Sequence, residues 1–483
     1  MRIKVISRLM GLLIIFLAWN MLPSMLWSIY YNEPVWRDFV FSIALFTGIG
    51  LAMIAFGHDQ TNTSLYKKEA LTIVTFSWLI AGLMGAFPFF TSGYIPHYVD
   101  AFFETISGFT TTGASILSDI EVLPKGLLFW RSYTHWLGGM GIIVLFLALI
   151  PFVGASGKRM YQFEVPGPDV EGLKPKIQST SMILWGIYLG ITVLILLLLR
   201  LAGMNWFDSF CHTFGAIGTG GFSTKNLSIG YYQNLWIHGI ILLAIILAAT
   251  NFSIHYYFIK RKFSLVFKDW EFRAYYTLML GASLVIAWIL FSQNIFSSFW
   301  KSWLYAAFNS ISMMTSTGYA TTDFDLWPVN VKIIIFILMF VGGCGGSTSG
   351  GIKIVRFLIL FKYGYNQIVK SYSPQRKFIL RLGDKLIDRD VVKRTMVFFF
   401  LYIVLYIVGV FCMSCFHVDW MTAFSSVAAC FNTAGPGFSQ VGPMVNYGFL
   451  HPAAKLILTF FMIAGRLEIF ALLVFFIPDF WKR

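Results

Sequence analysis

The chain has 483 residues, of which 57% are hydrophobic and 12% are charged. With a mean hydropathy of +0.72, this composition excludes an ordinary soluble domain and indicates a membrane protein. The formal net charge of +14 does not indicate a nucleic-acid partner, because most basic residues cluster between apolar runs. Such clusters follow the positive-inside pattern, so we expect them on the cytoplasmic face, near anionic lipid headgroups.

Apolar runs long enough to cross a bilayer, about 20 residues each, recur along the whole chain. The first run follows basic residues, as in a secretory signal, but it is long and lacks a clean small-residue cleavage site, so we expect a retained helix. The sequence predicts an all-α polytopic membrane protein with about ten crossings and both termini in the cytoplasm. The runs lie near residues 9–31, 39–56, 70–92, 127–153, 180–202, 234–258, 274–292, 329–370 (interrupted), 392–416 and 452–477.

The cysteines and histidines give no sign of a metal centre or a catalytic site. The five cysteines lie in or beside apolar runs without zinc-ligand spacing, and the C-x-x-C of Cys412 and Cys415 favours buried packing over redox chemistry. The histidines form no helix-spaced pairs in the apolar runs, which disfavours a haem-carrying respiratory subunit. Since no Ser-His-Asp or paired-carboxylate pattern occurs either, we expect neither an enzyme nor a covalent cofactor.

After the first two runs, the apolar runs come in pairs, and each pair encloses an unusual loop. The four loops read DAFFETISGFTTTGAS from Asp100, DSFCHTFGAIGTGGFS from Asp208, YAAFNSISMMTSTGYA from Tyr305 and TAFSSVAACFNTAGPG from Thr422. Aligned without gaps, they share one glycine column, with a hydroxyl residue two positions earlier. One such loop alone is compatible with an ordinary turn, but four copies about 100 residues apart indicate an internal repeat.

The repeat predicts five units in the chain. They are two N-terminal helices at 1–66, and helix/pore-loop/helix repeats at 67–160, 161–263, 264–372 and 373–483. One polypeptide would thus supply a pseudo-tetramer around a central pore.

The loops have the composition of a cation filter. Irregular backbone at membrane depth is tolerated only where protein buries it or where it lines a wet cavity, and backbone carbonyls can there replace a cation's hydration shell. Glycine reaches the necessary backbone angles, and each short helix aims its partially negative end at the ion. The predicted filter residues, with potassium as the transported ligand, are Thr111, Thr112, Gly113, Thr219, Gly220, Gly221, Ser316, Thr317, Gly318, Thr433, Ala434 and Gly435.

Four acidic residues, Asp119, Glu121, Asp323 and Asp325, are expected on the outer side near the mouth of the pore. They either raise the local cation concentration there or are ordinary loop residues.

The second helix of the third repeat is interrupted by GGCGGSTSGG. Each glycine costs a helix about 1 kcal/mol relative to alanine, so we expect an irregular segment. It faintly resembles a phosphate-binding loop, but Lys353 is displaced and no strand precedes it, so nucleotide binding is not expected. We predict an intramembrane loop that blocks or opens the pore, with a tight helix-packing seam as the alternative; its candidate residues are Gly342, Gly343, Gly345, Gly346, Ser347, Thr348, Ser349, Gly350 and Gly351.

Arg466 lies near the middle of the last apolar run, close to Glu468. A charge at this depth is costly and indicates a functional site. Either Arg466 faces the pore and bonds to carbonyls of the glycine-rich loop, or it belongs to a structural ion pair between helices.

Together these motifs resemble the Trk/Ktr/HKT superfamily of potassium transporters, and the two extra N-terminal helices resemble its TrkH type. The resemblance implies potassium uptake across the bacterial inner membrane by a homodimer in which each protomer has its own pore, gated by the intramembrane loop. It also implies a cytosolic TrkA-like RCK subunit that binds nucleotide, for which residues 353–394 offer a contact surface. Glycine rather than serine at Gly113 resembles the potassium-selective members.

Two modes of transport remain open from the sequence. One is channel-like flux down the electrochemical gradient, and the other is proton- or sodium-coupled symport. Glu104 and Glu468 are the carboxylates that could carry protons, or they could be hydrogen-bonded parts of the structure.

Overall fold

Helices make up almost all of the regular structure of the chain. A computed structural model describes residues 1–57, 65–141, 177–375, 380–383 and 385–482. Its strands β1 (Arg381–Leu382) and β2 (Lys385–Leu386) form one short antiparallel pair. Within the described residues, six helices are long and apolar enough to span a membrane, or eight spans if two bent helix pairs count as one each. The prediction of an all-α, multi-pass membrane protein is therefore confirmed.

Some parts of the prediction lie outside the described residues. They include the end of the apolar run near 127–153, and residues 376–379 and 384 of the surface at 353–394.

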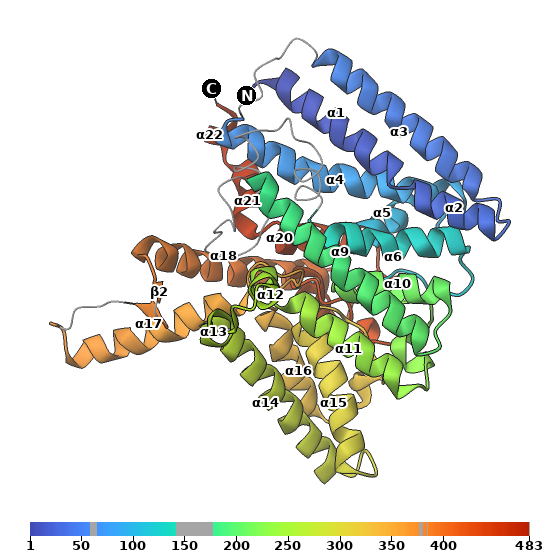
Figure 1. The fold of residues 1–483 in the computed structure, drawn as a ribbon. Coiled ribbons are helices and arrows are strands. Elements are labelled where there is room, and N and C mark those ends of the chain that lie inside the picture. The colour runs from blue at the N-terminus through green and yellow to red at the C-terminus, as the bar shows by residue number, and fades with distance from the viewer. Residues whose placement is uncertain (58–64, 142–176, 376–379, 384, 483) are drawn as a thin grey trace.

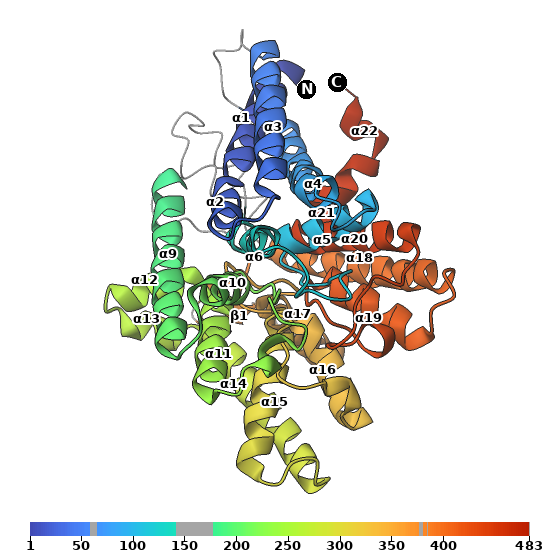
Figure 2. The same cartoon turned by 90° about the vertical axis from the view of Figure 1, so that its right-hand side faces the viewer.

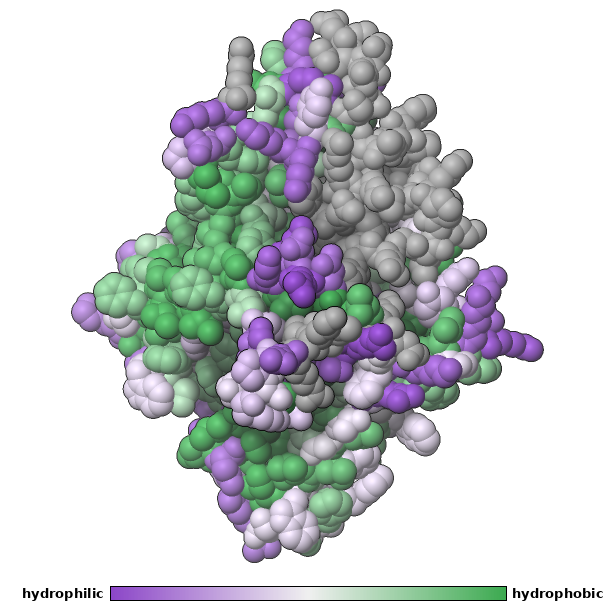
Figure 3. Space-filling model, turned by 90° about the vertical axis from the view of Figure 1, so that its left-hand side faces the viewer, coloured by the Kyte–Doolittle hydropathy of each residue, from purple (hydrophilic) through white to green (hydrophobic). Residues whose placement is uncertain are grey.

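Hydrophobic side chains cover broad areas of the surface, as the green regions in Figure 3 show. Trp288 is 64% exposed and Phe400 is 67% exposed. In a membrane protein such side chains face lipid, so their exposure is compatible with a stable fold.

The N-terminal helices form a layer at one side of the molecule (Figure 1). The elements are α1 (Ile3–Trp19), α2 (Leu22–Tyr30) and α3 (Trp36–Phe56). Helices α1 and α3 pack so closely that a β-carbon at Gly11 would lie only 2.6 Å from the carbonyl oxygen of Gly50. Small residues permit this close approach, as is common between membrane helices.

The first two repeats each consist of a long helix, a short buried helix and a return helix. The first contains α4 (Lys67–Thr91), α5 (Tyr98–Phe109) and α6 (Lys125–Gly139), and the second contains α9 (Ile177–Leu201), α10 (Trp206–Ile217), the 3₁₀ helix η2 (Ser228–Tyr231), α11 (Leu235–Ala249) and α12 (Phe252–Ile259).

The other two repeats have the same order. The third contains α13 (Phe263–Lys268), α14 (Trp270–Ser292), α15 (Phe299–Met314), η3 (Phe324–Leu326), α16 (Val329–Val341) and α17 (Ile354–Tyr372). The fourth contains α18 (Arg389–Ser414), α19 (Trp420–Phe431), η4 (Ser439–Val441), α20 (Pro452–Arg466), α21 (Ile469–Leu473), η5 (Val474–Phe476) and α22 (Pro478–Trp481).

Two apolar runs that the sequence presents as continuous are sharply bent. The run near 234–258 bends by 101° between α11 and α12, and the run near 452–477 bends by 120° after Arg466. The first break frees the last carbonyls of α11, which accept hydrogen bonds from the glycine-rich loop: Thr348 N bonds to Ala248 O at 3.2 Å and Cys344 N to Ala249 O at 3.0 Å. Hydropathy alone does not reveal such breaks, because both halves are apolar.

The short helices α5, α10, α15 and α19 lie around a common centre (Figure 2). Helix α5 has 12 residues and is about 18 Å long, too short to cross a hydrocarbon core of about 30 Å. These four short helices begin the four loops that the sequence predicts to form the pore, and they are called pore helices below.

Candidate ion filter and intramembrane loop

Each pore helix ends two residues before the hydroxyl residue of the repeat. In the first copy the Thr111 amide bonds to the Gly108 carbonyl at 3.0 Å and the Thr112 amide bonds to the Ser107 carbonyl at 2.8 Å. This pair of bonds is a Schellman motif, whose left-handed residue is usually glycine. Here that residue carries a side chain in all four copies, and the left-handed residues are Thr111 (φ 56°), Thr219 (φ 53°), Ser316 (φ 55°) and Thr433 (φ 51°).

A β-branched residue with positive φ is a strained outlier that costs on the order of 1–3 kcal/mol. Three of the four residues are threonines of this kind, and the fourth, Ser316, has the same positive φ. Strained backbone of this kind clusters at functional sites.

The four glycines two residues later form a closed cycle of contacts. A β-carbon at Gly113 would lie 2.0 Å from the Gly220 carbonyl oxygen, and one at Gly221 would lie 2.0 Å from the Thr317 oxygen. A β-carbon at Gly318 would lie 2.5 Å from the Ala434 carbonyl oxygen. One at Gly435 would lie 2.7 Å from the Thr112 carbonyl oxygen, which closes the cycle.

Each carbonyl in this cycle belongs to the residue just before the next glycine. All four glycines also have positive φ, between 79° and 84°. The predicted filter residues are thus brought together in one ring, with four loops in the order of the chain.

A polar residue on each pore helix holds the chain that leaves the filter. The Glu104 carboxylate accepts from the Ile116 amide at 2.8 Å, His212 bonds to the Ser223 hydroxyl at 3.0 Å, and Asn309 accepts from the Thr321 amide at 3.2 Å. In the fourth copy the Ser425 hydroxyl accepts from the Phe438 amide at 2.9 Å. These bonds fix the path of each loop after its glycine.

Glu104 also forms a buried ion pair with Arg131 of α6. Their side chains approach to 2.6 Å and are almost fully inaccessible to solvent. Arg131 donates a second bond to the Ser223 carbonyl of the next loop at 3.0 Å and lies 3.5 Å above the Phe222 ring. The pair therefore joins the first loop to the second.

A cavity of about 110 Å³ lies against the four filter glycines on the side where the loops leave the ring. It is lined by Ser115, Ser223, Asn226 and Lys225 among others, but within the described residues no carboxylate lines it. Glu121 instead contacts Lys225 at 3.3 Å, and Asp325 contacts Lys332 at 3.4 Å. Asp119 accepts from the Asn226 side chain and Asp323 from the Asp325 amide.

These contacts favour the interpretation that the four acidic residues are ordinary loop residues. Their side chains stabilise the outer loops.

The glycine-rich segment is an irregular loop between α16 and α17, anchored on neighbouring elements. The Gly345 amide donates to the Glu271 carboxylate at 2.7 Å, and the Phe252 amide donates to the Gly346 carbonyl at 3.2 Å. Gly342, Gly346 and Gly351 have positive φ between 68° and 69°. The interruption predicted from the sequence is thus present, and it is held at its edges by α11, α12 and α14.

The middle of this loop contacts three of the four hydroxyl residues. Thr348 lies 3.3 Å from the Thr219 hydroxyl, and the Gly350 amide donates to the Ser316 hydroxyl at 2.6 Å. A β-carbon at Gly350 would lie 1.8 Å from the Thr433 hydroxyl oxygen. The loop therefore packs directly against the base of the filter, on the side opposite the outer cavity.

Arg466 contacts the fourth hydroxyl and the same loop. Its guanidinium donates to the Thr111 hydroxyl at 3.2 Å and to the Thr348 carbonyl at 2.8 Å. It also donates to the carbonyls of Gly138 and Gly139 at the end of α6, at 2.5 and 2.6 Å. Of the two interpretations from the sequence, these contacts favour the one that places Arg466 beneath the filter.

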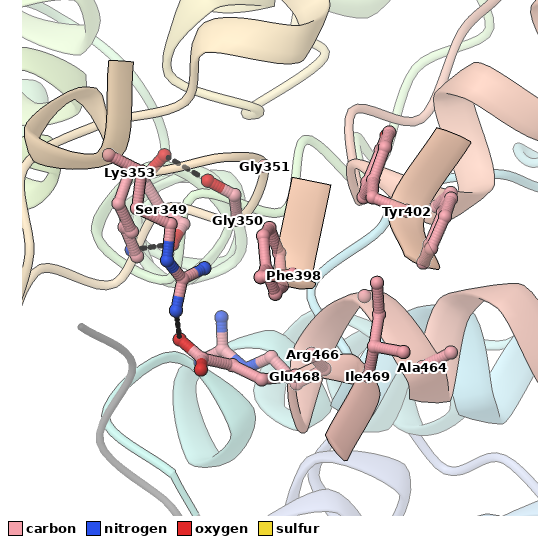
Figure 4. Close-up of a pocket in the computed structure, with 13 residues that line it drawn as sticks. Ser349, Gly350, Gly351, Lys353, Phe398, Tyr402, Ala464, Arg466, Glu468 and Ile469 are labelled. Carbon is pink, nitrogen blue, oxygen red and sulfur yellow. Dashed lines mark hydrogen bonds and ion pairs between the residues drawn. The ribbon is translucent and has the colours of Figure 1, made fainter. Parts of the chain in front are cut away.

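Two further basic residues hold the end of the loop. Lys353 is almost fully buried and donates to the Ser349 carbonyl at 2.5 Å. Arg356 lies 2.5 Å from the Glu468 carboxylate. Figure 4 shows Glu468 beside Arg466. The cavity among these residues measures about 20 Å³, which is room for about one water molecule and not for a hydrated cation.

The sequence analysis missed some of the residues that build this site. Arg131, His212 and Asn309 were not singled out, although the aligned loops carry a signal for His212 and Asn309. The column nine residues before the glycine is polar in every copy, within otherwise apolar helices: Glu104, His212, Asn309 and Ser426.

Comparison with known proteins agrees with this geometry. A family model described as TrkH, cation transport protein, matches residues 37–483. The chain is 35% identical to the Trk system potassium uptake protein TrkH of Escherichia coli strain K12, and the match covers 100% of both chains. It is 33% identical to the potassium uptake protein TrkG of the same strain over 99% of each chain.

Among solved structures, the crystal structure of the potassium transporter TrkH from Vibrio parahaemolyticus matches with a TM-score of 0.90. The two chains are 32% identical, and the match covers 100% of each. The matched proteins are transporters, which confirms the prediction that this chain is not an enzyme. From the fold, the full-length family match and these relatives, the chain belongs to the TrkH family of cation transport proteins.

Proposed function

We propose that this protein mediates potassium uptake across the bacterial inner membrane, through a filter made by its four pore loops. The observation that carries the proposal is the closed cycle of the four loops. In it, each filter glycine abuts the backbone carbonyl of the residue that precedes the filter glycine of the next loop. Such a ring offers carbonyl oxygens from four directions to one dehydrated cation. Potassium is the transported ligand, and the filter residues are those of the four aligned loops.

Potassium is favoured over sodium by two observations. The relatives from Escherichia coli are named potassium uptake proteins. All four positions of the filter column are glycine in this chain, so no side chain narrows the ring.

The glycine-rich loop and Arg466 form the gate in this proposal. Together they contact all four hydroxyl residues at the base of the filter, and Arg466 places a positive charge there. A fixed cation repels a permeating cation at short range. Conduction therefore requires the loop and Arg466 to move away from the filter.

Channel-like flux is the favoured mode of transport. The two carboxylates that could carry protons are both occupied by arginine partners, Glu104 by Arg131 and Glu468 by Arg356. Proton- or sodium-coupled symport is the alternative, and it predicts that uptake depends on external pH or sodium at fixed membrane potential.

Regulation by a cytosolic nucleotide-binding subunit of the TrkA-like RCK type, acting on a homodimer of this chain, completes the proposal. Helix α17 projects from the bundle (Figure 1) and carries an exposed stripe at helical spacing, Phe361, Tyr365, Ile368 and Tyr372. The surrounding residues 353–394 are rich in Lys and Arg. With both termini in the cytoplasm, this surface faces the cytosol and is available for docking.

The first test is rubidium or potassium flux into proteoliposomes that contain only this chain, with membrane potential clamped and sodium as competitor. The proposal expects potassium-selective flux that rises when residues Gly345–Gly350 are deleted. Flux that does not discriminate between potassium and sodium contradicts the filter. A folded deletion variant that stays closed contradicts the gate.

A further inference from the structure

Both termini lie at one end of the molecule (Figure 1). There an apolar cavity opens between the start of α4 and the C-terminal segment. Its volume is about 760 Å³, within the range of about 300–1,000 Å³ typical of ligand sites. Its walls are the apolar side chains of Leu71, Leu401, Phe470, Ala471, Leu473, Val474, Ile477 and Phe480. It is separate from the filter and from the gate.

The polar part of the lining consists of two adjacent lysines, Lys67 and Lys68, in the first turn of α4. Both side chains are exposed. The Lys68 ammonium donates to the Lys482 carbonyl at 3.0 Å and lies 5.7 Å from the centre of the Phe480 ring. The acidic residue of the same turn, Glu69, is buried and pairs with Arg2 at 2.8 Å.

The cavity adjoins the start of a candidate membrane span. Helix α4 is a candidate membrane span that begins at Lys67. The two lysines therefore lie at the level of the headgroups, and Leu71, one turn further along α4, begins the apolar wall. A ligand that fits has an anionic head and an apolar tail, and the bilayer supplies such a molecule directly.

We propose that this cavity binds an anionic phospholipid, with the lipid phosphate at Lys67 and Lys68 and an acyl chain along α21 and η5. Charge complementarity selects the headgroup, because lysines near the membrane surface attract anionic lipids. The apolar walls hold the chain by removing its methylene groups from the boundary with water.

Native mass spectrometry of the purified full-length protein tests this site. The protein is stripped of lipid and titrated with phosphatidylglycerol or with phosphatidylcholine of identical acyl chains. We expect the protein to retain a bound phosphatidylglycerol molecule at a lipid concentration about tenfold lower than the one needed for bound phosphatidylcholine. The variant Lys67→Gln/Lys68→Gln should lose this preference, whereas Lys260→Gln/Lys262→Gln, which removes two exposed lysines elsewhere, should keep it.

A second variant tests the apolar wall that is proposed to bind the acyl chain of the lipid. Val474→Trp fills the cavity and should abolish retention of both lipids, while its melting temperature in lipid-free detergent stays that of the parent. Leu71→Phe serves the same purpose if Val474→Trp does not fold. Equal binding of the two lipids by the parent overturns the proposal, as does unchanged phosphatidylglycerol retention in a folded cavity-filling variant.

Two other outcomes assign the cavity to a different occupant and also overturn the proposal. If inorganic phosphate, added at the same concentration as the lipid, displaced phosphatidylglycerol, the cavity would be a simple anion site. A change in oligomeric state of Val474→Trp without lipid would indicate that a second copy of the chain covers the cavity.

Discussion

Arg466 donates a hydrogen bond of 3.2 Å to the hydroxyl of Thr111, two residues before the first filter glycine. The strained, left-handed backbone at Thr111 is what turns this hydroxyl toward the guanidinium. A charge at the end of α20 is thus coupled to the first pore loop. This contact belongs to a set of contacts at the base of the candidate filter.

Replacing Arg466 by alanine should raise the basal cation flux several-fold, because it removes the fixed positive charge and the bond to Thr348. Arg466→Lys should give an intermediate flux, since lysine keeps the charge but cannot bond to four acceptors in the same fork geometry. Rubidium flux into proteoliposomes measures both. Arg200→Ala, which removes an arginine from α9, is the control, and an Arg466→Ala protein that is folded but impermeable contradicts the gating role.

The loop-to-filter contact can be tested with two serines of the same loop. The Ser349 hydroxyl lies 3.1 Å from the Ser316 hydroxyl and also accepts from the Gly343 amide at 2.9 Å within the loop, whereas the Ser347 hydroxyl donates to the Cys344 carbonyl within the loop. Of the Ser349 bonds, the one to Ser316 joins the loop to a pore loop. Loss of that one hydrogen bond costs about 1 kcal/mol, so Ser349→Ala should raise the open probability about fivefold. Single-channel recording measures this quantity, and an equal effect of Ser347→Ala would show that the loop responds to any substitution.

Serine at filter glycines should reduce discrimination between potassium and sodium. At Gly113 the new β-carbon would meet the Gly220 carbonyl oxygen at 2.0 Å, so the ring must distort, and at Gly318 it would meet the Ala434 oxygen at 2.5 Å. We expect about a tenfold loss of selectivity, equivalent to about 1.4 kcal/mol, with membrane insertion retained. Competition between the two ions in the flux assay measures the change.

Gly190→Ser is the matched control for both filter variants. Gly190 lies in α9, where a β-carbon would meet no atom within 4 Å. Unchanged selectivity in both Gly113→Ser and Gly318→Ser would rule out the four-loop filter.

Removing Arg131 should destabilise the protein, because it leaves the Glu104 carboxylate buried without its partner. Breaking a buried ion pair costs about 3–5 kcal/mol, so Arg131→Ala should show a clear drop in melting temperature. Arg200→Ala provides the comparison with an arginine that is not paired to Glu104.

Glu104→Gln separates a structural role from proton transport. The amide still accepts a hydrogen bond from the Ile116 amide. It leaves Arg131 buried without a counter-charge, so we expect a lower melting temperature, and uptake is compared in protein that remains folded. We expect the response of uptake to external pH to be the same as in the parent. A pH response that disappears only in this variant would support coupled symport.

The sequence predicted the parts of the site that repeat, and it missed those that depend on contacts between repeats. The glycine and hydroxyl columns were visible because every copy carries them. The bends after Ala249 and Arg466 were not, because they are set by hydrogen bonds to the loop and by the left-handed backbone at Glu468. The Glu104 and Arg131 pair was missed because its partners lie on different helices and belong to no common motif.

The ring of filter contacts comes from one polypeptide, and its four sides are not equal. The carbonyl oxygen of the neighbouring loop lies closer to the β-carbon position of Gly113 and Gly221 than to that of Gly318 and Gly435. In a channel of four identical subunits, one codon change alters all four walls of the pore at once. Here each of the four loops has its own codons, so a mutation changes one side of the ring and leaves the other three unchanged.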